Sequence, residues 1–128
     1  MPGKVKVGII GSGFEADIHA ASFQIMPEEA EVVAVASPTP GHADHLAKKF
    51  GIPRVFTDYR DMLAERVIEM VTITAPNALH ARMTADIAAA GKHVVCEKPL
   101  CMSIAEAEEK IDVCRSKGVL LLYAEELY

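Results

Sequence analysis

The chain has 128 residues and a formal net charge of -5, and 51% of its residues are hydrophobic while 5% are aromatic. This length allows one domain with a hydrophobic core and leaves no room for a second domain of ordinary size. The negative charge and the lack of a basic stripe argue against a nucleic-acid partner, and no apolar run is long enough to cross a membrane. The three cysteines form an odd set without zinc-type spacing, which is typical of a protein in the reducing cytoplasm. Together with the missing membrane span, this predicts a soluble, cytoplasmic protein.

The first half of the chain alternates short β-branched runs with helical patterns. A strand is predicted over 4–10, a helix over 14–26, a second strand over 31–37 and a second helix over 41–51. Both strands are almost entirely apolar toward their ends, which is typical of strands covered on both faces. Gly51 is expected to end the second helix in the left-handed conformation.

The same alternation continues through the second half. Further strands are predicted over 54–56, 69–74, 92–97 and 119–125, with helices over 58–65, 77–91 and 103–118 between them. Asn77 is placed to cap the start of its helix, and Gly91 and Gly118 are placed to end theirs. Ser103 and Glu106 have the spacing of a capping box.

Strands and helices that alternate through short connections predict an α/β fold with a doubly wound parallel sheet, the Rossmann fold. About six strands are expected, in the order 3-2-1-4-5-6, within a single domain over residues 1–128. In such folds the ligand crevice lies at the carboxyl ends of the strands. Candidate site residues are therefore those that directly follow a predicted strand.

The stretch GIIGSGFEAD at 8–17 has the pattern G-x-G-x-x-A between a predicted strand and a predicted helix. In this context Gly11 permits a tight turn, Gly13 lets the backbone approach a pyrophosphate, and Ala16 lets the helix pack close to the strand. Phe14 opens the helix, whose N-terminus attracts phosphate. The pattern thus predicts a dinucleotide site, with a purely structural turn as the alternative. A P-loop is excluded because no Gly-Lys-Ser/Thr follows.

The end of the second strand bears on the choice between NADP and NAD. Ser37 stands about 20 residues beyond the glycine motif, where NAD enzymes place a carboxylate on the ribose. A serine repels no 2′-phosphate, and His42, His45, Lys48 and Lys49 follow closely. We therefore prefer NADP and keep NAD as the alternative. These basic residues could instead only solvate a helix face, and no arginine stands beside Ser37.

Other chemistry is poorly supported by the sequence. His42 and His45 are three residues apart, but no carboxylate or cysteine pattern completes a metal site around them, so no metal is predicted. Cys96 is expected in the core, and Cys101 and Cys114 have no identifiable base. Nucleophilic catalysis by cysteine is not expected.

Two further stretches identify a family resemblance. APNALH at 75–80 follows the fourth predicted strand, and AGKHVVCEKPL at 90–100 surrounds the fifth. Together with the glycine motif and Ser37, at these mutual spacings, they make the whole chain resemble the Gfo/Idh/MocA oxidoreductases. This family contains glucose-fructose oxidoreductase, inositol dehydrogenase and dihydrodiol dehydrogenases. The Glu-Lys-Pro at 97–99 is the most specific part of the resemblance.

The resemblance implies roles for this tripeptide. Lys98 is implied as the catalytic residue, near the nicotinamide ribose and the substrate hydroxyl, where an ammonium orients the alcohol and stabilises developing alkoxide charge. Glu97 would face the ribose and nicotinamide side of the cofactor. Pro99 would make rigid the turn that directs Lys98.

The residues after the fourth strand are implied to line the other flank of the cofactor. These are Pro76, Asn77 and His80. Two alternatives remain here, because Asn77 could serve only as a helix cap and His80 could be an ordinary surface histidine.

The family carries a second α/β domain that provides the substrate pocket and often an acid-base pair, and this sequence contains only the dinucleotide half. We therefore expect dinucleotide binding with little or no turnover.

Apolar surface that a second domain would cover favours self-association, so a homo-oligomer is expected. The tail LLLYAEELY at 120–128 is where we expect this surface to lie. Two alternatives to a dinucleotide-binding function remain: a domain that binds S-adenosylmethionine, and a noncatalytic scaffold.

Overall fold

The structure is a computed structural model that describes residues 5–11, 14–25, 28–38, 41–74, 80–97 and 104–124. Its strands are β1 (Val5–Ile10), β2 (Ala30–Ala36), β3 (Arg54–Phe56), β4 (Met70–Ile73), β5 (His93–Glu97) and β6 (Leu121–Ala124). Its helices are α1 (Phe14–Gln24), α2 (His42–Phe50), α3 (Tyr59–Leu63), α4 (His80–Ala89) and α5 (Ile104–Lys117). Every predicted element is present, and the observed bounds differ from the predicted ones mainly at the ends.

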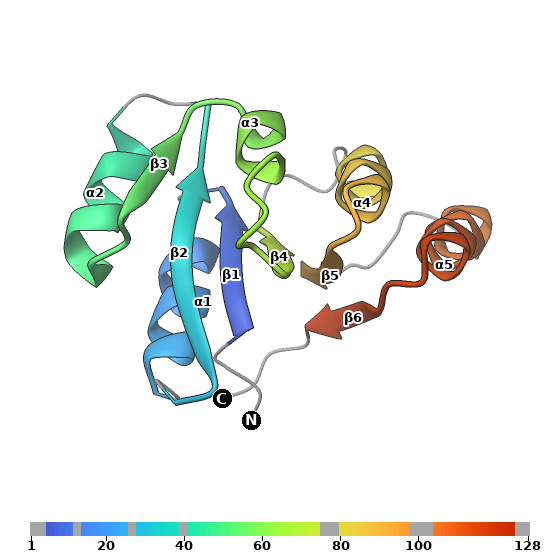
Figure 1. The fold of residues 1–128 in the computed structure, drawn as a ribbon, viewed down its shortest axis with the longest axis horizontal. Helices are drawn as coiled ribbons and strands as arrows, with labels where there is room; N and C mark the ends of the chain where they lie inside the picture. Colours follow the sequence, from blue (N-terminus) through green and yellow to red (C-terminus); the bar gives the residue numbers. More distant parts are fainter. Residues whose placement is uncertain are drawn as a thin grey trace.

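The six strands form one parallel sheet in the order β3-β2-β1-β4-β5-β6, as predicted. The register between β1 and β2 shifts once, because Val7 pairs with Val32 and Gly8 pairs with Ala34. Val33 is the extra residue, so β2 carries a β-bulge near its middle. Two helices cover one face of the sheet and three cover the other (Figure 1).

The core is divided between these two faces. On one face α1 and α2 pack small and aliphatic side chains over the centre of the sheet. On the other face α3, α4 and α5 build a larger cluster around β1, β2, β4 and β5. The strands are therefore buried on both faces, which explains their nearly continuous apolar sequences.

Three helices end in the way their glycines predict. Gly51, Gly91 and Gly118 all have positive φ, at 68°, 77° and 70°. In each case the residue after the glycine donates its N–H to a carbonyl five residues earlier, which is the 6→1 bond of a Schellman motif: Ile52 to Ala47, Lys92 to Ile87 and Val119 to Cys114. These bonds explain why β5 and β6 begin later than predicted, since Lys92 and Val119 belong to the helix ends.

Candidate functional site

Three residues that follow β1, β2 and β4 meet at the carboxyl edge of the sheet. Gly11 donates its N–H to the carbonyl of Ala36 at 2.8 Å, and Thr74 donates its N–H to the carbonyl of Ile10 at 2.9 Å. Ser37 is tied to the edge strand by an N–H bond of 3.0 Å to the carbonyl of Phe56. This edge is the ligand crevice of a doubly wound sheet.

Gly11 fits this edge because any side chain there would collide. Its φ is +108°, and a Cβ would lie 2.3 Å from the Thr74 hydroxyl oxygen and 3.2 Å from the Thr74 carbonyl carbon. The Thr74 hydroxyl is itself fixed, because it donates to the carbonyl of Ile10 at 2.7 Å. The chain can therefore leave β1 in a tight turn only with glycine at this position.

The helix after the turn packs directly on the sheet. Ala16 and Ala20 on α1 are fully buried against Ile9 of β1 and Val35 of β2. Small side chains at these two positions allow the close approach of helix and strand that the glycine motif predicts for Ala16. Phe14 is the first residue of α1, and the structure describes only its backbone. The described part of the motif fits a dinucleotide, because the helix begins directly above the tight turn.

Ser37 lies directly after β2 and is 5% exposed. No carboxylate occupies this position, as the sequence indicates. His42 is the exposed first residue of α2, and the N-cap residue before it, Gly41, makes no side-chain cap bond. Ser37, His42 and the start of α2 thus lie on the same side of the crevice.

The lysines that were expected beside Ser37 lie elsewhere. Lys48 and Lys49 are in the last turn of α2. Six residues of helix separate Lys48 from His42, which is about 9 Å along the axis, so these lysines lie away from the carboxyl edge. Both lysines are exposed, which agrees with the alternative that they only solvate a helix face.

Several predicted site residues lie wholly or partly outside the described residues. Wholly outside are Gly13, Pro76, Asn77, Lys98 and Pro99. His80 begins α4 and Glu97 ends β5, both described by backbone alone. Both positions are where the family resemblance needs them, but the roles of all these residues stay predictions.

A small pocket on the α3 and α4 face was not anticipated. Its volume is about 220 Å³, and its lining is Tyr59, Arg60, Arg82 and Met83. Tyr59 donates its hydroxyl to the carboxylate of Asp86, and the Arg60 guanidinium lies 5.9 Å from the centre of the Tyr59 ring. Burial, and then the hydrogen bond to Asp86, raise the pKa of Tyr59. No sequence motif links α3 to α4, so only the fold could reveal this pocket.

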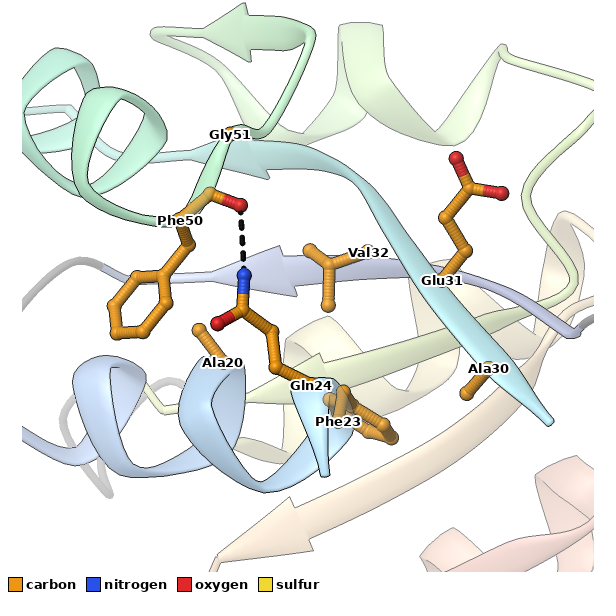
Figure 2. Close-up of a pocket in the computed structure, with 8 residues that line it drawn as sticks. All are labelled: Ala20, Phe23, Gln24, Ala30, Glu31, Val32, Phe50 and Gly51. Atoms are coloured by element: carbon orange, nitrogen blue, oxygen red, sulfur yellow. Dashed lines mark hydrogen bonds between the residues drawn. The ribbon is translucent and has the colours of Figure 1, made fainter. Parts of the chain in front are cut away.

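Two larger cavities lie at the amino-terminal edge of the sheet, opposite the carboxyl edge that carries Gly11 and Ser37. One is about 400 Å³ and lies between α1, β2 and the end of α2, where the Gln24 amide donates to the carbonyl of Phe50 at 3.0 Å (Figure 2). The other is about 500 Å³ and lies between the α3–β4 and α4–β5 connections. Neither contains a predicted site residue, so cavity size alone does not mark the dinucleotide site.

The described residues contain neither a membrane-spanning helix nor a cluster of metal ligands. No described helix combines the length and apolar character that a membrane crossing requires. The described histidines, cysteines and carboxylates form no group of three that could hold a metal ion, and His42 and His45 are both exposed.

The chain is similar to several oxidoreductases of known sequence or structure. An uncharacterised oxidoreductase, ORF334 of Rhizobium meliloti, is 41% identical over 88% of this chain and 34% of its own length. The D-xylose 1-dehydrogenase (NADP(+)) 2 of Haloferax volcanii is 36% identical over 92% of this chain and 35% of its own length. A solved structure of levoglucosan dehydrogenase in complex with NADH has a TM-score of 0.85 and 32% identity, covering 94% of this chain and 34% of that one. The chain thus spans about a third of the length of these relatives.

A family model described as an oxidoreductase family with an NAD-binding Rossmann fold matches residues 5–125. The match covers the glycine motif, Ser37 and the Glu-Lys-Pro tripeptide in one continuous stretch. The match favours an NAD-binding domain over the alternative of an S-adenosylmethionine-binding domain. The chain belongs to the Gfo/Idh/MocA oxidoreductase family and has the fold of its NAD(P)-binding Rossmann domain.

Proposed function

We propose that this chain binds NADP in preference to NAD at the carboxyl edge of its sheet. The observation that carries the proposal is Ser37 at the end of β2, in place of a carboxylate that would repel a 2′-phosphate. Gly11 and Ser37 are joined through β2, because Gly11 bonds to the carbonyl of Ala36 next to Ser37. A dinucleotide with its pyrophosphate at the glycine turn therefore brings its adenosine ribose toward Ser37.

The start of α2 supports the same preference. Gly41 is the N-cap residue of α2, has a φ of 88° and carries no side chain that could cap the first N–H groups, so we expect these groups to attract an anion bound at this edge. His42 adds an exposed imidazole at this helix start. Asp44 in the first turn offsets part of the positive field, which leaves Ser37 as the main support.

For the reaction, we propose hydride transfer between the nicotinamide and an alcohol carbon of a sugar, polyol or dihydrodiol. The bound nicotinamide supplies the hydride chemistry. Lys98 would orient the hydroxyl and stabilise its developing negative charge. Glu97 would face the ribose and nicotinamide side of the cofactor, and Pro99 would make rigid the turn that directs Lys98. Pro76, Asn77 and His80 would line the other flank of the cofactor. A base that accepts the hydroxyl proton is also required, and none is assigned within residues 1–128. A polypeptide of these 128 residues should therefore bind the dinucleotide with little or no turnover.

We further propose that these residues act as a single domain in the cytoplasm and associate with copies of themselves. The buried, reduced thiol of Cys114 suits a reducing compartment. Large apolar side chains remain exposed, including Leu120 in the tail at 60% and Ile25 at 83%, and such surface favours association. A monomeric mass at high protein concentration would contradict the association.

A fluorescence titration with NADPH tests the proposed function, with NADH and S-adenosylmethionine as competitors. We expect saturable NADPH binding that NADH competes with less strongly. Ser37→Asp should weaken NADPH binding by about tenfold or more while affecting NADH less, because the new carboxylate repels the 2′-phosphate. Ser116→Asp, at an exposed position on α5, is the matched control.

The outcomes separate the hypotheses. Equal affinity for NADPH and NADH would refute the NADP preference and leave the dinucleotide site standing. Loss of NADPH binding in Gly13→Val, with binding retained in Gly51→Val at the far end of α2, would locate the pyrophosphate at the glycine turn. No binding of any of the three ligands would favour the noncatalytic scaffold.

A further inference from the structure

The cavity of about 500 Å³ lies at the amino-terminal edge, remote from the dinucleotide crevice. Its walls are the connection from α3 to β4 and the connection from α4 to β5. Glu69 and His93 mark this edge, because His93 donates its N–H to the carbonyl of Glu69 just before β4 begins. The volume is within the range of small-molecule sites.

Lys92 lines this groove, and 5% of its surface is exposed. Its ammonium donates to the carbonyls of Glu65 and Ile68, both at 2.8 Å. An ammonium has three N–H donors, so one remains after these two bonds. Both acceptors are neutral, and burial lowers the pKa of Lys92.

The nearby carboxylates do not neutralise this ammonium. The Glu65 carboxylate pairs with the guanidinium of Arg54. The Glu69 carboxylate also lines the groove and accepts the backbone N–H of Lys6 at 3.1 Å, a neutral donor that leaves the charge of Glu69 in place at the rim. A buried cation that has only neutral partners is stabilised when an anion binds beside it.

Two more donors line the same groove. The Nδ1 atom of His93 accepts the N–H of Leu120 at 3.0 Å, which leaves Nε2 as the ring nitrogen that can donate. Arg66 on the other wall is exposed and has no ion-pair partner among the described residues. Three donor side chains therefore line one cavity: Arg66 from the α3–β4 connection, Lys92 from the α4–β5 connection and His93 from the start of β5.

The end of α4 also lines the groove, and free helix carbonyls there would repel an anion. Three of these carbonyls are occupied, because Ala90, Gly91 and Lys92 donate their N–H groups to the carbonyls of Asp86, Ala88 and Ile87. We propose that this groove binds a phosphate group, free or carried by a small metabolite, through Lys92, His93 and Arg66. Phosphate suits the site because it offers several oxygen acceptors and more than one negative charge to these donors.

The test uses histidine NMR on the full chain, with inorganic phosphate and glycerol 3-phosphate as probes and with NADH present at saturation. Either probe should shift the imidazole signals of His93 saturably, because a phosphate oxygen would accept its Nε2 proton. Arg66→Ala should weaken binding by about tenfold, as expected for one charge-assisted bond. Arg115→Ala, at another exposed arginine in the last turn of α5, should leave affinity unchanged.

Equal affinity in the Arg66→Ala and Arg115→Ala variants, or no change at His93, would overturn the proposal. Probe binding that is present without NADH and lost at saturating NADH would also overturn it, because the phosphate would then occupy the dinucleotide crevice. Tighter binding of glycerol 3-phosphate would identify a phosphorylated metabolite, and equal or tighter binding of inorganic phosphate would identify the free ion. The variant comparison does not require dinucleotide binding, so it stands even if the proposed function fails.

Discussion

Replacing Gly11 with alanine should destabilise the fold by about 2–4 kcal/mol. Holding an alanine at a φ of +108° costs about 1–3 kcal/mol. The new Cβ would also lie 2.3 Å from the Thr74 hydroxyl oxygen, which cannot occur without movement. Moving Thr74 breaks its bond to the carbonyl of Ile10, which is worth about 0.5–1.5 kcal/mol.

The two contributions can be separated by a double-mutant cycle. Thr74→Ala removes the hydroxyl, and the next nearest atoms to the new Cβ are then the Thr74 backbone carbon and oxygen, at 3.2 and 3.3 Å. Gly11→Ala should therefore cost about 1–2 kcal/mol less in the Thr74→Ala background than in the natural chain. Gly51→Ala is the matched control, because Gly51 also has a positive φ but a Cβ there would meet no atom within 4 Å, so strain alone should cost it about 1 kcal/mol.

Urea unfolding followed by circular dichroism measures all four variants. A loss of about 3 kcal/mol moves the midpoint by about 1.5 M at a slope of about 2 kcal/mol/M. The reasoning is refuted if Gly11→Ala costs no more than Gly51→Ala. It is equally refuted if Thr74→Ala gives no relief, because the steric contact would then not be the cause.

Three further predictions concern the core and its buried polar groups. Thr72→Val should stabilise the chain by about 1 kcal/mol in urea unfolding, because the buried Thr72 hydroxyl has no hydrogen-bond partner among the described residues. Thr84→Val, at an equally buried threonine that has a partner, should give no such gain. Ile87→Ala should lower the free energy of unfolding by about 2–5 kcal/mol and with it the thermal midpoint, because Ile87 is fully buried. Ile25→Ala, at a position that is 83% exposed, should change the free energy of unfolding by under about 0.5 kcal/mol. Burial and the Asp86 bond raise the pKa of Tyr59 above its usual value of 10.0, so the folded state holds this proton longer than the unfolded state. The stability that this provides is fully present below pH 10.0 and is lost as pH rises through the folded pKa, and Tyr59→Phe should abolish that loss in unfolding curves taken across this range.

The local parts of the fold were predictable because their signals are local. Apolar runs and helical periods identified every strand and helix, and the alternation of elements predicted the parallel order. Gly51, Gly91 and Gly118 marked helix ends because a residue with positive φ favours glycine wherever it occurs. The glycine motif likewise placed a tight turn at Gly11.

Lys92 shows where local reasoning stops. The sequence placed it at the start of a strand, but it occupies the position after a helix-ending glycine where Ile52 and Val119 stand in the other two helices. Those two side chains are buried and apolar, and Lys92 is buried with them. A lysine is ordinarily exposed, so its burial depends on the carbonyls of Glu65 and Ile68 that the α3–β4 connection brings to it.

The sequence by itself determined the elements, the sheet order and the family, because periodicity, helix ends and a short motif are set by neighbouring residues. The tertiary structure alone decided which distant residues meet: Gly11 against Thr74, Tyr59 against Asp86, and Lys92 against the loop before β4. It also separated Lys48 and Lys49 from the crevice that their nearness to Ser37 suggested. The physical reason is that hydrogen bonds, collisions and desolvation depend on distances in space, which the packing of helices on the sheet sets.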